Sequence, residues 1–146
     1  MRLLALETGG DYCSVAFWQD GQLLCRQRAT PQQHHQHLLP LLDALLAEAG
    51  CTLAQLDALA FGQGPGAFTG VRIAASVTQA LALAQDLPVV PVSSLAALAH
   101  AAYRHHGAVA VLAALDARMG QVYWGGYRIL ALGVVEQVTA ESVAYP

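Results

Sequence analysis

The stretch "GQGPGAFTGVR", residues 62–72, holds the residue types best suited to chemistry in this sequence. Glycine-rich turns that open a helix can bind phosphate, because the first backbone N–H groups of the helix point at the anion. This stretch lacks the G-K-[ST] of a Walker A loop, and Pro65 has no N–H to donate. The hydroxyl of Thr69 is placed to cap the following helix. The sequence therefore predicts either a tight strand-to-helix turn, with Arg72 paired to an acid or a partner, or a degenerate phosphate site.

A second candidate site lies where the first apolar segment ends, at Glu7, Thr8 and Gly9. A two-metal nuclease needs several carboxylates that converge, and Asp11 is the nearest candidate to join Glu7. That number is too small, so we reject a nuclease. Glu7 and the turn after it could still hold a phosphate, which would suit an ATPase or a small-molecule kinase.

The histidines His34, His35 and His37 resemble a metal-ligand set in composition. Three histidines within four residues of a loop cannot all point one way without strain, and no local carboxylate or cysteine joins them. We therefore predict a solvated loop over residues 31–37 and no metal site.

Charge and composition exclude several classes of protein. The net charge is −3, and the seven positive charges are scattered arginines. Independent nucleic-acid binding needs a clustered basic face, so we do not expect it. The 146 residues are 55% hydrophobic and 12% charged, yet no apolar run is long enough to span a membrane. The first residues meet Glu7 too early for a signal peptide.

The cysteines and the apolar excess point to a cytoplasmic protein with a partner. Cys13, Cys25 and Cys51 are odd in number and widely spaced, which favours reduced thiols over a disulfide framework. The mean hydropathy of +0.43 is high for a monomer, so we expect apolar surface left over for another protein.

The order of predicted elements indicates an α/β fold. Apolar alternation and an Asp20-Gly21 hairpin signal predict three antiparallel strands at the start of the chain. The predicted strands are 2–8, 12–19, 22–30, 58–63, 87–92, 108–118, 121–130 and 133–143, and the predicted helices are 38–49, 71–84 and one from Ser93 or Ser94 to about 103. The βββαβαβ order is that of a ribonuclease-H-like lobe of the actin-like ATPase (ASKHA) architecture. We expect this lobe over residues 1–103 and the beginning of a second, truncated lobe over residues 104–146.

The first two predicted helices carry more apolar surface than one sheet can cover. The segment 71–84 is apolar on nearly all sides, and such a helix is normally buried. We therefore predict a helical interface with another protein. Its candidate residues are Leu38, Leu41, Leu42, Leu45, Ala75, Ser76, Gln79, Ala80 and Leu83.

Three stretches resemble the bacterial TsaB family, also called YeaZ: "LALETGGDYCSVAFW" (3–17), "GQGPGAFTGVRIA" (62–74) and "LAALDARMGQVYW" (112–124). The second and third stretches are specific in combination, and the resemblance covers essentially the whole chain. The family motif loop falls on Gly64, Pro65, Gly66, Phe68, Thr69, Gly70 and Arg72.

The resemblance implies a role in transfer-RNA modification. TsaB is the non-catalytic partner of the TsaD threonylcarbamoyl transferase, to which the small ATPase TsaE also binds, and it forms homodimers. The resemblance implies contact with TsaD through the first two helices and only indirect contact with transfer RNA. ATP and metal are expected on the partner subunits, so no cofactor is expected on this chain.

The third helix tests whether this chain could itself be the transferase. The resemblance implies that TsaD holds its metal with two histidines four residues apart at the start of this helix. Ser94 and Leu98 stand at the matching positions here. Leucine cannot ligate a metal, so a catalytic metal site, and with it a peptidase activity, is not expected.

Overall fold

The computed structural model describes residues 1–29 and 33–145, which fall into two compact units. Residues 1–63 and 67–92 form the first unit, and residues 64–66 group with the chain from Ser93 onward in the second. Thr30 at the end of a predicted strand, Pro31 and Gln32 of the predicted loop, and Pro146 lie outside the described residues.

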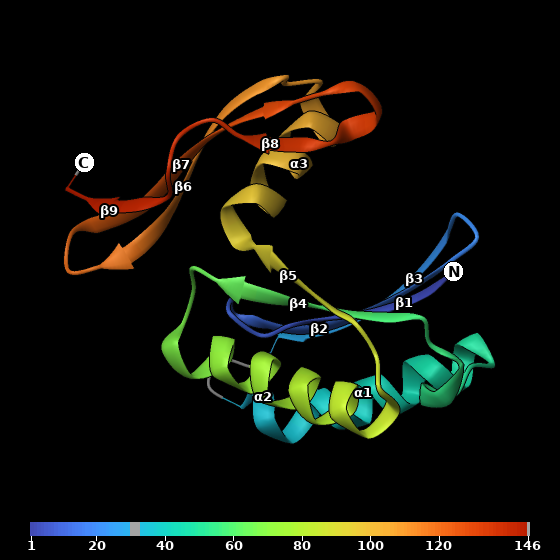
Figure 1. Ribbon diagram of the computed structural model, residues 1–146. Helices are drawn as coiled ribbons and strands as arrows, with labels where there is room; N and C mark the ends of the chain where they lie inside the picture. The colour runs from blue at the N-terminus through green and yellow to red at the C-terminus, as the bar shows by residue number, and fades with distance from the viewer. Residues whose placement is uncertain (30–32, 146) are drawn as a thin grey trace. The chain divides into compact units, whose positions relative to one another are not determined.

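The first unit is built on a five-stranded mixed sheet with the order β3-β2-β1-β4-β5 (Figure 1). Its strands are β1 (Arg2–Glu7), β2 (Tyr12–Gln19), β3 (Gln22–Ala29), β4 (Ala58–Gly64) and β5 (Val89–Ser93). The first three strands are antiparallel, and β4 runs parallel to β1. Asp20 and Gly21 both adopt positive φ, as a two-residue hairpin of this twist requires. The βββαβαβ order and the three antiparallel strands predicted from the sequence are confirmed.

Helices α1 (His34–Ala49) and α2 (Phe68–Gln85) cover one face of this sheet, and a short 3-10 helix, η1 (Leu53–Gln55), precedes β4 (Figure 1). The prediction that helix α1 begins at residue 38 is wrong. The helix starts at His34 and continues through Pro40, which lacks the N–H of one helical hydrogen bond. The predicted loop over residues 31–37 is therefore helical from His34 onward.

The core of the first unit lies between the sheet and the two helices. Alternate residues of β1 and β2 face the helices, so Leu4 and Leu6 pack with Val15 and Phe17. Leu38, Leu42 and Leu45 of α1 complete this core.

The second unit packs α3 (Ser94–His106) against a four-stranded antiparallel sheet. Its strands are β6 (Ala110–Arg118), β7 (Gln121–Ile129), β8 (Val135–Gln137) and β9 (Ser142–Ala144), with a 3-10 turn, η2 (Ala131–Gly133), before β8. The single strand predicted over residues 133–143 is instead two short strands, because the chain bends at Val138 and Thr139. Both of these residues donate N–H groups to the carbonyl of Gly126.

Helix α3 covers one face of β6 and β7. Leu95 and Ala99 are fully buried with Ala113 and Tyr127. The structure thus groups α3 with the strands that follow it, whereas the sequence analysis placed the boundary between the lobes at residue 103.

Glu141 ties the start of α3 to the sheet of the second unit. The Ser93 hydroxyl caps α3 by accepting from Leu95 N at 3.1 Å and Ala96 N at 3.3 Å, as predicted, and it donates to Glu141 Oε1. Tyr127 also donates its hydroxyl to Glu141 Oε1. Burial, and next the hydrogen bond to Glu141, raise the pKa of Tyr127 to about 12.

The cysteines lie as the hairpin register predicts. Cys25 is opposite Ala16, and Cys13 is opposite Arg28. All three cysteines are unbridged, and burial raises the pKa of the Cys13 thiol. Among the described residues, no helix is long and apolar enough to cross a membrane.

Candidate functional site

The end of β1 and the start of α2 are joined by hydrogen bonds within the first unit. The fully buried Thr8 donates its hydroxyl to the carbonyl of Gly70 at 2.6 Å. Ala67 N donates to the carbonyl of Gly9 at 2.7 Å, and the Glu7 carboxylate accepts from Gly9 N. Two candidate sites from the sequence, the Glu7-Thr8-Gly9 turn and the glycine loop, are therefore neighbours in space.

Gly70 is required by the closeness of these two segments. A Cβ atom at Gly70 would lie 1.9 Å from the carbonyl oxygen of Thr8, which is backbone and cannot move aside easily. The glycine therefore lets the first turn of α2 pack directly on the end of β1. Gly62 has a similar role on β4, because the Glu7 side chain lies where a Cβ atom at Gly62 would be.

These contacts favour the tight-turn interpretation of the loop. The N–H of Ala67 already bonds to Gly9, and Gly70 makes a close packing contact. Gly64 is buried and is joined to Pro65 by a cis peptide bond, and Gly66 is exposed. The phosphate-site interpretation stays a prediction.

The prediction that Thr69 caps α2 is wrong. The helix begins at Phe68, so Thr69 lies inside the first turn, and Ala67 is the N-cap residue without a side-chain cap. The helix starts two residues earlier than a Thr69 cap would place it, because Val71 N already bonds to the carbonyl of Ala67.

Arg72 is held by its own helix and not by an acid. Its Nη1 donates to the carbonyl of Phe68 at 3.1 Å, and its guanidinium lies 3.3 Å from the centroid of the Phe68 ring. No carboxylate of the described residues forms an ion pair with Arg72. Phe68 is itself 73% exposed. The two side chains form a charged aromatic pair on the surface of α2.

The structure corrects part of the predicted helical interface. Leu38, Leu42 and Leu45 have at most 1% of their surface exposed, because this stripe of α1 faces the sheet. They belong to the core and cannot contact a partner in the folded chain. Leu41 is partly buried against the same core.

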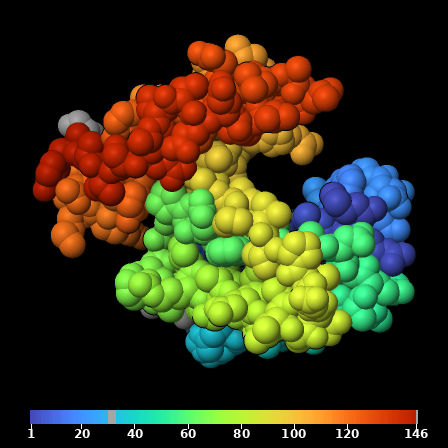
Figure 2. Space-filling model, viewed as in Figure 1, coloured from blue at the N-terminus to red at the C-terminus, as the bar shows by residue number. Residues whose placement is uncertain are grey.

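The α2 residues of the predicted interface are accessible. Ser76, Gln79 and Ala80 are exposed, Ala75 is half-buried, and Leu83 is 85% exposed. In Figure 2 the light-green to yellow-green atoms of α2 form a continuous part of the visible surface. A long apolar side chain with this exposure, beside small ones, is the kind of surface that a second helix could cover.

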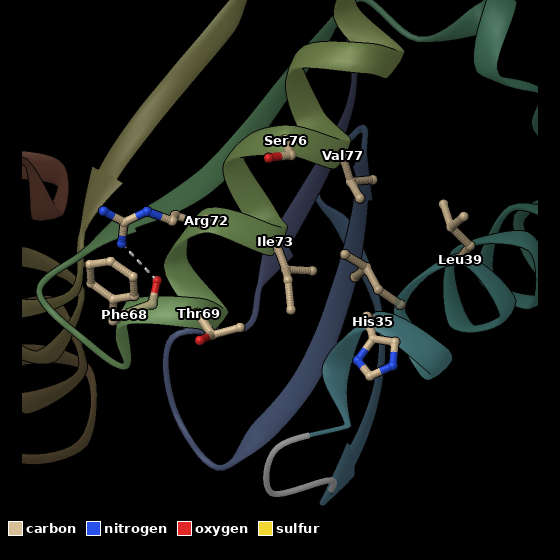
Figure 3. A pocket seen from close by; sticks show the side chains of 9 residues that line it. His35, Leu39, Phe68, Thr69, Arg72, Ile73, Ser76 and Val77 are labelled. Carbon is tan, nitrogen blue, oxygen red and sulfur yellow. Dashed lines mark hydrogen bonds between the residues drawn. The ribbon is translucent and has the colours of Figure 1, made fainter.

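A shallow groove of about 350 Å³ separates the first turns of the two helices (Figure 3). His35 and Leu39 line it from α1, and Thr69, Ile73 and Val77 line it from α2. Apolar groups form most of the lining, and the Phe68–Arg72 pair lies at one end. This groove extends the accessible face of α2 toward α1.

The three neighbouring histidines of the sequence lie at the start of α1. His34 is buried, whereas His35 is exposed, so the prediction of a solvated set holds for only part of it. Within residues 1–29 and 33–145, no group of three or more His, Cys, Asp or Glu side chains is arranged to hold a metal ion.

The stretch "DARMG" forms the turn between β6 and β7. Asp116 Oδ1 accepts from Arg118 N at 2.7 Å, and a bulge lies between these two residues. Arg118, Met119 and Gly120 all adopt positive φ. Turn geometry therefore explains Asp116 and Gly120, but it does not explain why arginine and methionine stand at positions 118 and 119.

Two residues of α2 that the sequence analysis did not assign to a site stand out in the structure. Thr78 is fully buried, and within the described chain its hydroxyl has no hydrogen-bond partner. Asp86 ends the helix in the left-handed conformation and forms no ion pair with another described residue. Arg72 and Asp86 are fourteen residues apart, which is about four helical turns. The sequence alone could therefore have predicted that both lie on the same side of α2.

Comparisons with known proteins identify the family. The family model described as "TsaD: tRNA N6-adenosine threonylcarbamoyltransferase" matches residues 28–144. The chain is 44% identical over its full length to "tRNA threonylcarbamoyladenosine biosynthesis protein TsaB" of Escherichia coli and spans 63% of that protein. The protein of the same name from Haemophilus influenzae is 48% identical over 85% of this chain, which is 52% of its own length.

A solved structure agrees with these matches. "YeaZ from Pseudomonas aeruginosa" is 51% identical, with a TM-score of 0.94 over 99% of this chain and 68% of that one. This neighbour supports the α/β fold that the sequence predicted. The chain thus spans between about half and two-thirds of the length of these relatives, and it belongs to the TsaB (YeaZ) family.

Proposed function

We propose that this chain acts in tRNA threonylcarbamoyladenosine biosynthesis as a scaffold and activating subunit of a TsaD-like transferase. The observation that carries the proposal is the accessible face of α2, on which Leu83 is 85% exposed beside Ser76, Gln79 and Ala80. The names of its relatives indicate the process in which the chain is proposed to act. The match to the TsaD family model indicates the kind of partner.

The same proposal makes the chain a non-catalytic subunit. Ser94 and Leu98 stand where the resemblance places the metal-binding histidines of the transferase, and Leu98 is 40% exposed on α3. A leucine offers no lone pair to a metal, so the chain is proposed to work without a cofactor of its own. ATP and metal then belong to the partner subunits.

The remaining parts of the proposal concern assembly and location. A TsaE-like ATPase would join through the transferase, and the chain would form a homodimer when the transferase is absent. Transfer RNA would be contacted indirectly, because the chain carries a net charge of −3 with scattered arginines. The unbridged cysteines fit a reducing compartment, and we propose the cytoplasm.

Reconstitution of the modification tests this function. The transferase and the ATPase from the same source are incubated with transfer RNA and the threonylcarbamoyl donor, with and without this chain. We expect threonylcarbamoyladenosine to form faster by about tenfold or more when the chain is present. An unchanged rate would contradict the scaffold function.

A pair of leucine variants locates the interface. Leu83→Glu places a charge on the exposed face of α2, whereas Leu132→Glu does so at the fully exposed η2 turn of the second unit. We expect size-exclusion chromatography with light scattering to show loss of the transferase complex for Leu83→Glu alone. Leu45→Glu is unsuitable, because Leu45 lies in the core and its charge would unfold the chain.

The alternative, an ATPase or small-molecule kinase that uses Glu7, Thr8 and Gly9, is not favoured. The Thr8 hydroxyl already donates to the carbonyl of Gly70, and the Glu7 carboxylate already accepts from Gly9 N. Calorimetric titration with Mg–ATP separates the two functions, since the kinase requires binding and the scaffold does not.

A further inference from the structure

The end of α2 carries an acid at a position where a helix disfavours one. Asp86 is the C-cap residue and adopts the left-handed conformation, with φ 51° and ψ 46°. Glycine is usual at such a position, and the negative end of the helix dipole repels a carboxylate. No residue of the described ranges forms an ion pair with Asp86, and the last turn of α2 has no basic side chain. The fold therefore gives no reason for an acid here.

Thr78 is a second polar group of α2 that the fold leaves unexplained. It is fully buried, and its hydroxyl has no hydrogen-bond partner within residues 1–29 and 33–145. A buried hydroxyl without a partner destabilises a protein, so valine would be the more stable residue at this position. A group from outside the chain is one of the few ways to satisfy such a hydroxyl.

Thr78 and Asp86 line the same groove, which has a volume of about 510 Å³. Phe61, Leu83 and Leu87 are among its apolar walls. Asp86 supplies the charge among the described residues that line it. Sites for small molecules have volumes of this order, with apolar walls and a few polar groups. We call this cavity the Asp86 groove.

The groups of the Asp86 groove select a ligand by charge and by length. A carboxylate at the negative end of a helix attracts a cation and repels an anion. Eight residues separate Thr78 from Asp86, which is about 12 Å along the helix axis, and Leu83 lies between them. A matching ligand has an ammonium or guanidinium group, an apolar stem and a neutral hydrogen-bonding group at the far end. Carboxylates and phosphates do not match, because none of the described lining residues is basic.

We propose that the Asp86 groove binds a small organic cation of this class. The cation pairs with the Asp86 carboxylate, the stem lies on Leu83 and Leu87, and the far polar group bonds to the Thr78 hydroxyl. Each of the two polar residues destabilises the free chain and contributes a contact in the bound one, which accounts for both. The site goes beyond the proposed function and does not rest on it, because every contact comes from this chain.

Three six-carbon probes test the chemistry of the ligand. Aminohexanol has an ammonium and a hydroxyl at its two ends, hexanediol lacks the charge, and aminohexanoate has a carboxylate in place of the hydroxyl. Each probe is titrated into the full chain, and the backbone amide signals are followed by NMR. We expect aminohexanol to saturate with a dissociation constant on the order of 1 mM and to shift the amides of Thr78, Leu83 and Asp86. The other two probes should bind about fivefold more weakly or worse.

Two conservative variants assign the contacts. Asp86→Asn keeps a residue that tolerates the left-handed conformation and removes only the charge, and Thr78→Val removes only the hydroxyl. Each should weaken the binding of aminohexanol about fivefold. Both should also raise the urea midpoint of the free chain, whereas a purely structural role predicts a lower midpoint. The matched control is Asp43→Asn, which removes an exposed carboxylate of α1 outside the groove and should leave binding unchanged.

Four results would overturn the site. They are no saturable binding of aminohexanol, amide shifts confined to another part of the chain, equal binding of hexanediol, and unchanged binding in Asp86→Asn. These titrations use this chain alone, whereas the scaffold function is tested by reconstitution with the transferase. Loss of the cation site would therefore leave the proposed function standing, and an unchanged modification rate would leave the cation site standing.

Discussion

Two fully buried threonines of the first unit are in opposite states of hydrogen bonding. Thr8 donates to Gly70 O at 2.6 Å, whereas the Thr78 hydroxyl has no partner in the part of the chain that the structure describes. Valine has nearly the shape of threonine without its hydroxyl. Thr8→Val should therefore lower the free energy of unfolding by about 2 kcal/mol, and Thr78→Val should raise it by about 1 kcal/mol.

Urea unfolding at a concentration where light scattering gives the monomer mass measures both changes. The two variants control for each other, because the chemical change is the same and the burial is equal. If both changes in the free energy of unfolding had the same sign, either the Thr78 hydroxyl has a partner or the Thr8 hydroxyl does not stabilise the fold.

Tyr127 should make the second unit sensitive to alkali. Burial and the hydrogen bond to Glu141 raise its pKa from 10.0 to about 12, so the folded chain holds this proton more tightly than the unfolded chain. Stability is then unaffected below about pH 10 and falls as the pH rises from about 10 to about 12, by on the order of 2 kcal/mol. The urea midpoint of Tyr127→Phe should lose less over this range, and an equal loss in both proteins would contradict the assignment.

The buried leucines of α1 show what a residue pattern cannot decide. The predicted apolar stripe of Leu38, Leu42 and Leu45 is present in the structure, but it faces the sheet and not a partner. Periodicity says that a face is buried and does not say against what. Leu83 could be predicted correctly as accessible surface because α2 has apolar residues beyond those that the sheet covers, and Leu83 is 85% exposed.

At the scale of the elements, the junction of β1 and α2 depends on Gly70. A Cβ atom there would meet the backbone of Thr8 at 1.9 Å, so Gly70→Ala should push α2 from the sheet and cost about 2 kcal/mol. Gly10 lies two residues after Thr8 in the chain, and a Cβ atom added there would have no heavy atom within 4 Å. Gly10→Ala should change the thermal midpoint little. If both variants unfold like the wild type, the loop glycines are not needed for packing.

Element order could be predicted from the sequence, and several element ends could not. The hairpin at Asp20-Gly21 was predictable, because both positions need positive φ and the residue types permit it. The predicted start of α1 at residue 38 is wrong, because a proline normally stands in the first turn of a helix and α1 continues through Pro40. The bend that separates β8 from β9 depends on contacts with Gly126, and these long-range hydrogen bonds leave no local pattern in residues 133–143.

At the scale of the whole molecule, the two units have separate cores. The first joins the five-stranded sheet with α1 and α2, and the second joins α3 with β6 and β7. The clusters share no residue among those described. Each unit also contains one tryptophan, Trp18 on β2 and Trp124 on β7. The chain has two tryptophans in total, so each unit can be followed separately by fluorescence.

Unfolding should therefore give two midpoints when the tryptophans are studied one at a time. A Trp124→Phe chain reports on the first unit, and a Trp18→Phe chain on the second. Thr78→Val should raise the urea midpoint seen by Trp18 and leave that of Trp124 in place. Tyr127→Phe removes a buried hydrogen bond worth about 1 kcal/mol and should lower the midpoint seen by Trp124 alone. If either substitution moved both midpoints equally, the two cores would unfold as one cooperative structure, and a stability change in one unit could then not be assigned to that unit.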